Sequence, residues 1–379
     1  MSYLGENIPK LGFGLMRLPT IGEGPGGAID LEHTKKMVDL FLERGFKYFD
    51  TAYGYSNGES EKAIKAALVE RYPRDSFYLA TKLPAWSGAK DAEEAKAMFY
   101  TSLERTGAGY FDFYLLHNVG ATRTAKFDEY GIWDYVLGLK EKGLVKHAGF
   151  SFHDSAELLD EILTKHPEME FVQLQINYAD WESGGVQSRA CHDVAWNKHH
   201  KPVVIMEPVK GGMLSNPADS VKAVFDAGGS GASYSSWAIR FAASLPGVIT
   251  VLSGMSNIEQ MDDNTSYMQD FKPLSDAEQA VIKGAQDALA ALPGVPCTGC
   301  SYCTPVCPKS IVIPRIFDAM NRELIYGDAN AARFGYSWET NFGGKASDCV
   351  ECGQCQSVCP QKIKIIDTLK IAKEKYENA

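Results

Sequence analysis

Residues 112–117 read Asp-Phe-Tyr-Leu-Leu-His, four apolar residues between an acid and a histidine. A run that is apolar on both faces is typical of a strand buried in a parallel sheet. Seven further short runs of this character occur before residue 270, and longer segments of helical period separate them. The eight runs are 11–15, 47–50, 77–81, 112–116, 146–150, 171–175, 203–206 and 248–252.

The segments between the runs carry helix signals, such as the capping box that Asp91 and Glu94 form before residues 92–105. Strands that alternate with helices in this way predict an α/β fold, a closed (β/α)8 or TIM barrel. An open, doubly wound sheet is the alternative. Its Gly-x-Gly-x-x-Gly turn is absent, because Gly12-Phe13-Gly14 and Gly211-Gly212 are more typical of simple tight turns.

The chain of 379 residues is too long for one ordinary core. Beyond the last run, a capped helix is followed by the helix-breaking pair Pro293-Gly294. We therefore predict a barrel over 1–273, a linker helix over 274–296 and a small C-terminal domain over 297–379.

Apolar residues make up 45% of the chain and charged residues 23%, which is a globular composition. The net charge is -10, and the basic residues are interspersed with acids, so nucleic acid and anionic membranes are disfavoured as partners. The first residues do not have the cationic and then apolar pattern of a secretory signal. We expect a cytoplasmic protein.

The nine cysteines are unevenly distributed, since Cys191 alone precedes residue 297. The other eight form two C-x2-C-x2-C-x3-C-P motifs: Cys297, Cys300, Cys303 and Cys307 before Pro308, and Cys349, Cys352, Cys355 and Cys359 before Pro360. This spacing predicts two [4Fe-4S] clusters, in which the fourth cysteine of a motif commonly binds the other cluster. Disulfides and structural zinc are the alternatives. An intracellular compartment disfavours disulfides, and zinc usually takes two C-x2-C pairs.

Residues 297–379 resemble a bacterial-type two-cluster ferredoxin module. The spacer of 41 residues between Cys307 and Cys349 is closer to that of helical ferredoxins. Within it the sequence predicts one helix, 314–324, followed by a connection rich in glycine, asparagine and aromatic residues.

Four titratable residues stand at or after the ends of three neighbouring runs. Asp50 ends the second run and Tyr55 follows it, Lys82 follows the third run, and His117 follows the fourth. Each alone has an ordinary structural explanation, such as a helix cap, packing or a surface charge. In a (β/α) barrel, however, all strands end at one mouth, so the sequence predicts that these side chains converge there.

Over about residues 8–270 the chain resembles the aldo-keto reductases. The segments that carry the resemblance are Asp50-Thr51-Ala52-Tyr53-Gly54-Tyr55, Ala80-Thr81-Lys82 and Tyr114-Leu115-Leu116-His117. The resemblance implies interconversion of a carbonyl and an alcohol with NADP or NAD. Tyr55 would be the acid and the Lys82 ammonium would lower its pKa. Asp50 would hold Lys82, and His117 would bind the carbonyl oxygen.

The same resemblance implies a cofactor site. Its residues are Ser151, Gln173, Asn177 and Met206 near the nicotinamide, and Gly254, Gln260, Asp263 and Asn264 near the adenosine. Met206 replaces an aromatic residue that commonly stacks on nicotinamide. Gly254 and Gln260 stand where the family often has basic residues for the 2'-phosphate, so strong selectivity for NADPH is not expected.

The clusters admit more than one role. Hydride carries two electrons whereas a cluster passes one, so a direct relay needs an intermediary such as a flavin, for which the sequence shows no separate motif. We expect an oxidoreductase for a small carbonyl or alcohol whose clusters transfer electrons, either to or from a cofactor in the barrel or in exchange with an external electron carrier. The alternatives are a flavin-linked reductase, and an electron-transfer or redox-sensing nucleotide-binding protein whose clusters are structural.

Overall fold

The computed structural model describes residues 2–22, 27–121, 123–229, 232–297, 299, 301–359 and 361–377. The chain divides into two compact units. The first unit comprises Met1–Trp181, Gln187–Gly211 and Ser235–Asp276. The second comprises Glu182–Val186, Gly212–Tyr234 and Ala277–Ala379.

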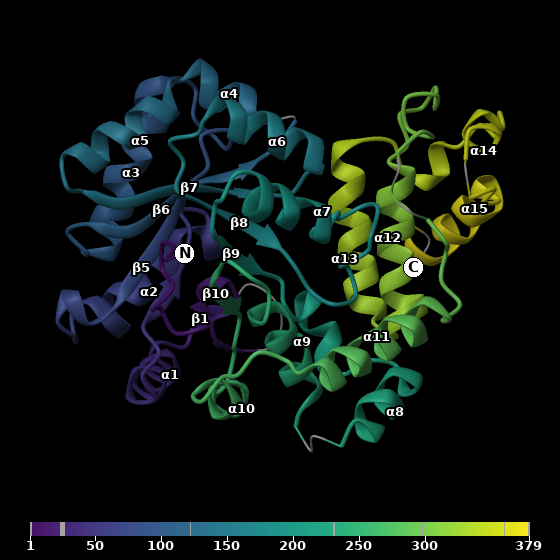
Figure 1. Cartoon of the computed structure of the whole chain (residues 1–379). Coiled ribbons are helices and arrows are strands. Elements are labelled where there is room, and N and C mark those ends of the chain that lie inside the picture. The colour runs from purple at the N-terminus through teal and green to yellow at the C-terminus, as the bar shows by residue number, and fades with distance from the viewer. Residues whose placement is uncertain are drawn as a thin grey trace. The chain divides into compact units, whose positions relative to one another are not determined.

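Within the described part of the chain, the first unit contains eight parallel strands that close into a barrel in chain order (Figure 1). The strands are β1 Leu11–Gly14, β4 Tyr48–Asp50, β5 Tyr78–Leu83, β6 Phe111–Val119, β7 Val145–Phe152, β8 Phe171–Gln175, β9 Val203–Met206 and β10 Val248–Ser253. Pairing of β1 with both β4 and β10 closes the ring. The predicted barrel and all eight predicted strands are thus confirmed. A short antiparallel pair of strands, β2 Thr20–Ile21 and β3 Ala28–Ile29, was not predicted from the sequence.

Helices of the first unit ring these strands (Figure 1). They are α1 Leu31–Glu43, α2 Glu59–Ile64, α3 Ala92–Thr106, α4 Thr124–Glu129, α5 Ile132–Glu141, α6 Ala156–Lys165, α7 Ser188–His192, α9 Tyr234–Ala243 and α10 Ile258–Met268. The predicted cap of α3 is present, because the Asp91 side chain accepts a hydrogen bond from the Glu94 N–H. The cap satisfies one of the backbone donors that a helix start leaves without a partner.

The end of the barrel where the strands begin is filled by aromatic rings. The Phe113 ring lies 5.0 Å from that of Tyr48 and 5.2 Å from that of Phe171, and all three side chains are buried. This apolar packing closes the interior at one end. The polar residues Asp50 and Lys82 are buried near the opposite ends of their strands.

The second unit is helical in its described residues. Its helices are α8 Asp219–Ala227, α11 Asp276–Ala290, α12 Ile313–Tyr326, α13 Ala329–Glu339, α14 Gln354–Ser357 and α15 Ile365–Tyr376. None of the helices described in either unit has the length and apolar character needed to cross a membrane.

The predicted irregular connection after residue 324 is wrong, because α13 occupies much of it. The Asp328 side chain accepts a hydrogen bond from the Ala331 N–H and caps this helix. Gly335, a weak helix former, lies against Ala319 and Arg322 of α12, where an added Cβ would be 3.4 Å and 3.2 Å from their side chains. Packing between the two helices therefore overrides the local propensity.

Candidate active site and cluster cavities

Tyr55 is presented by a strained turn that follows β4. Asp50 is the last residue of that strand, and Tyr55 begins the 3-10 turn Tyr55–Gly58. Ser56 and Asn57 have φ values of 48° and 55°, in the left-handed region that non-glycine residues rarely adopt. Such strain is common at functional sites, where the surrounding structure holds it in place.

Lys82 and His117 lie inside strands, so the expectation that each follows its strand is wrong. β5 continues through Lys82 to Leu83, which pairs with Leu116, and β6 continues through His117 to Val119. The apolar pattern stops before these residues, but the backbone pairing does not. The strand pairing of the barrel wall therefore holds the backbone of both residues in place.

The Lys82 ammonium is the centre of a buried polar cluster. Its Nζ lies 2.5 Å from Asp50 Oδ1, 2.8 Å from the Thr51 carbonyl oxygen and 3.3 Å from Tyr55 Oη. The Lys82 side chain is only 1% exposed and that of Asp50 is 2% exposed. Burial lowers the pKa of Lys82, but Asp50 and Tyr55 raise it by more, so the net shift is upward and the ammonium stays charged.

The protonation of Tyr55 differs from the expectation. Burial raises the pKa of Tyr55 and is the largest influence, while the nearby Lys82 charge lowers it as predicted. The net direction is upward, so the phenol keeps its proton at neutral pH. The sequence revealed the neighbouring charge but could not reveal that burial has the larger effect on the pKa of the phenol.

His117 completes this group of side chains. Its ring centroid is 6.0 Å from that of Tyr55, and its backbone oxygen accepts a hydrogen bond of 2.6 Å from the Trp86 indole. Burial and the Lys82 charge lower the pKa of His117 well below its ordinary value, so the ring is neutral. Its Nδ1 is buried with no hydrogen-bond partner among the described residues. The structure thus brings all four predicted residues together.

The buried Lys82–Asp50 pair leads to a prediction about stability. Lys82→Met would leave the Asp50 carboxylate buried without its counter-charge, and we expect a loss of about 3–5 kcal/mol in the free energy of unfolding. Urea-induced unfolding of the purified variant measures this loss. Asp50→Asn combined with Lys82→Met should recover part of it. Lys62→Met, which breaks the exposed pair with Glu59, should change stability far less. Equal losses in the two lysine variants would contradict the prediction.

The residues predicted near the nicotinamide lie on the next strands of the barrel. Ser151 on β7 accepts a hydrogen bond of 2.8 Å from the Asn118 N–H through its Oγ. Gln173 on β8 has its Nε2 3.5 Å from the Met206 sulfur, and its Oε1 is buried with no partner among the described residues. Asn177 is engaged within the protein, because its amide bonds the side chain and backbone of Asp180.

The residues predicted near the adenosine surround the start of α10. Gly254 is exposed directly after β10. The Gln260 side chain accepts a hydrogen bond of 2.7 Å from the Ser256 N–H and so closes the first turn. Asn264 is buried and donates to Ser253 Oγ at 2.9 Å, while Asp263 is half-buried. Neither Gly254 nor Gln260 offers a positive charge at this place.

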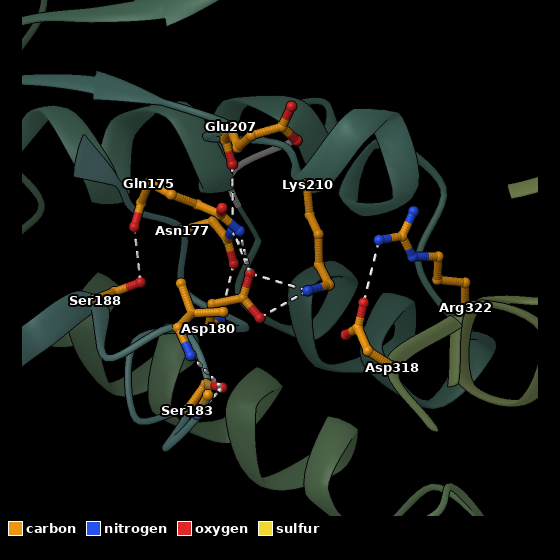
Figure 2. Close-up of polar contacts among 11 residues, drawn as sticks. Gln175, Asn177, Asp180, Ser183, Ser188, Glu207, Lys210, Asp318 and Arg322 are labelled. Atoms are coloured by element: carbon orange, nitrogen blue, oxygen red, sulfur yellow. Dashed lines mark hydrogen bonds and ion pairs between the residues drawn. The ribbon is translucent and has the colours of Figure 1, made fainter. Parts of the chain in front are cut away.

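An ion pair beside Asn177 was not predicted from the sequence. Lys210 Nζ lies 2.7 Å and 2.9 Å from the two carboxylate oxygens of Asp180, and Figure 2 shows these side chains pointing toward each other. Asn177 also donates to the Glu207 carbonyl oxygen at 3.1 Å. Glu207 and Lys210 have left-handed φ values of 56° and 48°, and Gly211 follows at 68°. The contacts join the end of β8 to the turn after β9. In the sequence, Lys210 directly before Gly211 and Gly212 could have pointed to this turn.

The cysteines of the second unit surround two cavities. The first cavity is lined by Cys307 of the first motif together with Cys349, Cys352 and Cys355 of the second. The second is lined by Cys297 and Cys303 of the first motif together with Cys359 of the second. Cys300 and Pro360 lie outside the described residues. Each described fourth cysteine therefore faces the three-cysteine segment of the other motif.

The walls of these cavities suit an iron–sulfur cluster. Thiolates are the ligands that such clusters take, and the remaining walls include Ile311, Ile313 and Leu369 in one cavity and Phe317 and Ile363 in the other. Cys307, Cys349, Cys352, Cys355 and Cys359 carry free thiols rather than disulfides. Among the described residues, no three thiol, imidazole or carboxylate groups converge as they would on a single metal ion. The thiols are instead spread around the cavity walls.

Comparison with family models matches both regions. Residues 10–287 match the aldo/keto reductase family, and residues 296–363 match a 4Fe-4S dicluster domain. An aldo-keto reductase from Mycolicibacterium vanbaalenii is 31% identical over 221 residues, which cover 55% of this chain and 70% of that protein. An aldo-keto reductase from Mycolicibacterium smegmatis is 34% identical over 133 residues, and the match spans 44% of its length.

Solved structures share the barrel fold. An aldo-keto reductase from Bacillus halodurans, in its holo form, superposes with a TM-score of 0.59 at 24% identity, over 75% of this chain and 95% of that one. An aldo-keto reductase from Klebsiella pneumoniae in complex with NADPH superposes with a TM-score of 0.56 at 20% identity, over 73% of this chain and 90% of that one.

Among the sequence relatives, a methylglyoxal reductase from Yersinia pestis is 32% identical over 154 residues, or 40% of this chain and 48% of that protein.

Proposed function

Because the chain belongs to the aldo/keto reductase family and carries a 4Fe-4S dicluster domain, we propose that its barrel interconverts a small carbonyl compound and the corresponding alcohol with NADPH or NADH. The observation that carries this proposal is the contact of the half-buried Tyr55 Oη with the buried Lys82 ammonium, which is itself held by Asp50. A protonated phenol beside a fixed positive charge is suited to act as a general acid.

Each of the four side chains has its own role in carbonyl reduction. When bound, the nicotinamide supplies hydride to the carbonyl carbon. Tyr55 Oη gives its proton to the carbonyl oxygen as negative charge develops there, and Lys82 stabilises the phenolate that is left. Asp50 keeps Lys82 charged and oriented. The neutral His117 ring, which is half-buried beside Tyr55, hydrogen-bonds the carbonyl oxygen and orients the substrate.

We also propose that residues 151, 173, 177 and 206 contact the nicotinamide and that the segment 254–264 contacts the adenosine. The buried Gln173 Oε1 supports the first part, because it lacks a partner among the described residues. The cap that occupies Gln260 and the absence of a side chain at Gly254 support weak discrimination between NADPH and NADH. The Asp180–Lys210 pair would keep the neighbouring turn in its strained conformation.

For the C-terminal region we propose two [4Fe-4S] clusters, one in each cavity, with Cys307 and Cys359 exchanged between motifs. The corresponding division of the chain is 1–273, 274–296 and 297–379. The lining of each cavity by cysteines from both motifs supports this assignment. We propose that the clusters exchange single electrons with an external carrier. Coupling them to two-electron chemistry in the barrel would need a flavin or similar intermediary.

The pH dependence of turnover tests the role of Tyr55. Tyr55 loses its proton, and with it the acid form, as the pH rises through the pKa of its phenol. Burial raises this pKa above the ordinary value of about 10. The rate of carbonyl reduction should therefore stay flat between about pH 6 and 9 and decline only in more alkaline solution. NADPH and NADH oxidation by the anaerobically purified protein, with a panel of small aldehydes and ketones, measures the profile. Loss of activity with an apparent pKa near 7, or no turnover with any carbonyl, would contradict the proposal.

A further inference from the structure

An open groove lies in the second unit beside one of the cysteine-lined cavities. Its described lining includes Val295, Leu324, Gln361, Lys362, Ile363 and Lys364. Gln361 and Ile363 also line the cavity that contains Cys297, Cys303 and Cys359. A single layer of residues thus separates the groove from the proposed cluster.

The groove is built from well-held elements. Asn321 of α12 binds the backbone of Val295 on both sides, donating to its carbonyl oxygen at 2.9 Å and accepting from its N–H at 2.7 Å. The Lys362 N–H donates to the carbonyl oxygen of Cys359 at 3.1 Å. This hydrogen bond connects the rim of the groove, formed by Lys362 and Lys364, directly to a proposed cluster ligand. Leu324 adds an apolar contact surface and is 40% exposed.

The charged residues in the described lining of the groove have one sign. Lys362 and Lys364 are exposed, and no acid is present in the described lining. Residues 297–379 contain 10 basic and 9 acidic residues, whereas the rest of the chain has 28 and 39. The full chain therefore carries its excess negative charge outside this region. An acidic protein would be repelled by most of the chain and attracted to this rim.

We propose that this groove docks a small acidic protein that carries one electron at a time, and that Lys362 and Lys364 are its principal contacts. The proposal rests on the assignment of a cluster to the adjacent cavity. Each productive encounter oxidises the carrier by one electron and reduces one cluster by one electron, so no further reactant is needed. Small, charged and short-lived contacts are typical of electron-transfer complexes.

The test uses the full-length protein with its clusters and a reduced acidic ferredoxin as the probe. Stopped-flow absorbance follows cluster reduction at low and high salt in the wild type, in Lys362→Glu/Lys364→Glu and in Lys373→Glu. Lys373 is an exposed lysine of α15 that does not line the groove. Carbodiimide cross-linking followed by mass spectrometry identifies which lysines touch the carrier, independently of any rate.

We expect cluster reduction in the double variant to be at least about tenfold slower at low salt, with the difference shrinking as salt screens the charges. Cross-links should form at Lys362 or Lys364, and Lys373→Glu should behave as the wild type. Equal rates in all three proteins, an equal loss in Lys373→Glu, or cross-links confined to other lysines would overturn the proposal. Iron and sulfide assays come first: protein without clusters refutes the cluster assignment and the docking site together, whereas clustered protein with unaffected variants refutes the docking site alone.

Discussion

The Tyr55→Phe variant is expected to reduce carbonyl compounds at least about 100-fold more slowly than the wild type, because a positioned general acid contributes about 10²–10⁴ in rate. The phenol hydroxyl is 3.3 Å from the Lys82 ammonium, and phenylalanine keeps the ring while removing the proton donor. The loss should fall on kcat and kcat/KM alike, since the proton is transferred only in the transition state. Steady-state kinetics with a saturating nicotinamide cofactor measure it.

Tyr53→Phe is the matched control for this experiment. Tyr53 lies two residues earlier in the same segment, and its ring contacts the Arg105 guanidinium at 4.5 Å. Phenylalanine preserves that contact, so turnover should stay close to the wild-type value. Unchanged turnover in Tyr55→Phe would remove the tyrosine from the chemistry, and equal losses in both variants would indicate damage to the turn.

The second large effect is expected from Cys307→Ala, which should remove the cluster bound by the second motif rather than the first. Cys307 lines the cavity with Cys349, Cys352 and Cys355, so its loss opens that site. Iron and sulfide should fall from about eight to about four atoms of each per chain. Cys191→Ala, a buried cysteine outside both motifs, should keep the full content.

Double variants distinguish crossed ligands from separate ones. Cys307→Ala/Cys352→Ala removes two ligands of one cavity, so it should lose no more iron than Cys307→Ala alone. Cys307→Ala/Cys303→Ala removes one ligand from each cavity and should lose nearly all the iron. If each motif held its own cluster, the two double variants would exchange these results.

The sequence was sufficient for the architecture because buried parallel strands impose an unmistakable pattern. Each apolar run, including 112–116, became a strand, and the polar residues after the runs pointed to one mouth. The apolar pattern suggested that Lys82 and His117 follow their strands. Both residues lie inside the strands, since backbone pairing continues where the apolar pattern stops. The sequence did not reveal α13 because packing of Gly335 on α12 outweighs its poor helix propensity.

Features that depend on burial or distant contacts could not be predicted in the same way. A lysine near Tyr55 suggested a lowered pKa, but burial outweighs the lysine charge and the net shift of the Tyr55 pKa is upward. The Asp180–Lys210 pair joins residues 30 positions apart, and no local pattern connects them. Cysteines of both motifs line each cavity, and the exchange of the fourth cysteine between clusters stays a prediction from their spacing.

The central claim is that the barrel moves hydride from a nicotinamide to a carbonyl carbon. Single-turnover incubation with NADPH deuterated at C4, in separate reactions for each of the two C4 positions, tests it most directly by mass spectrometry of the alcohol product. We expect a product one mass unit heavier with one of the two labelled cofactors and an unlabelled product with the other. An unlabelled alcohol from both cofactors, or no alcohol at all, would contradict it.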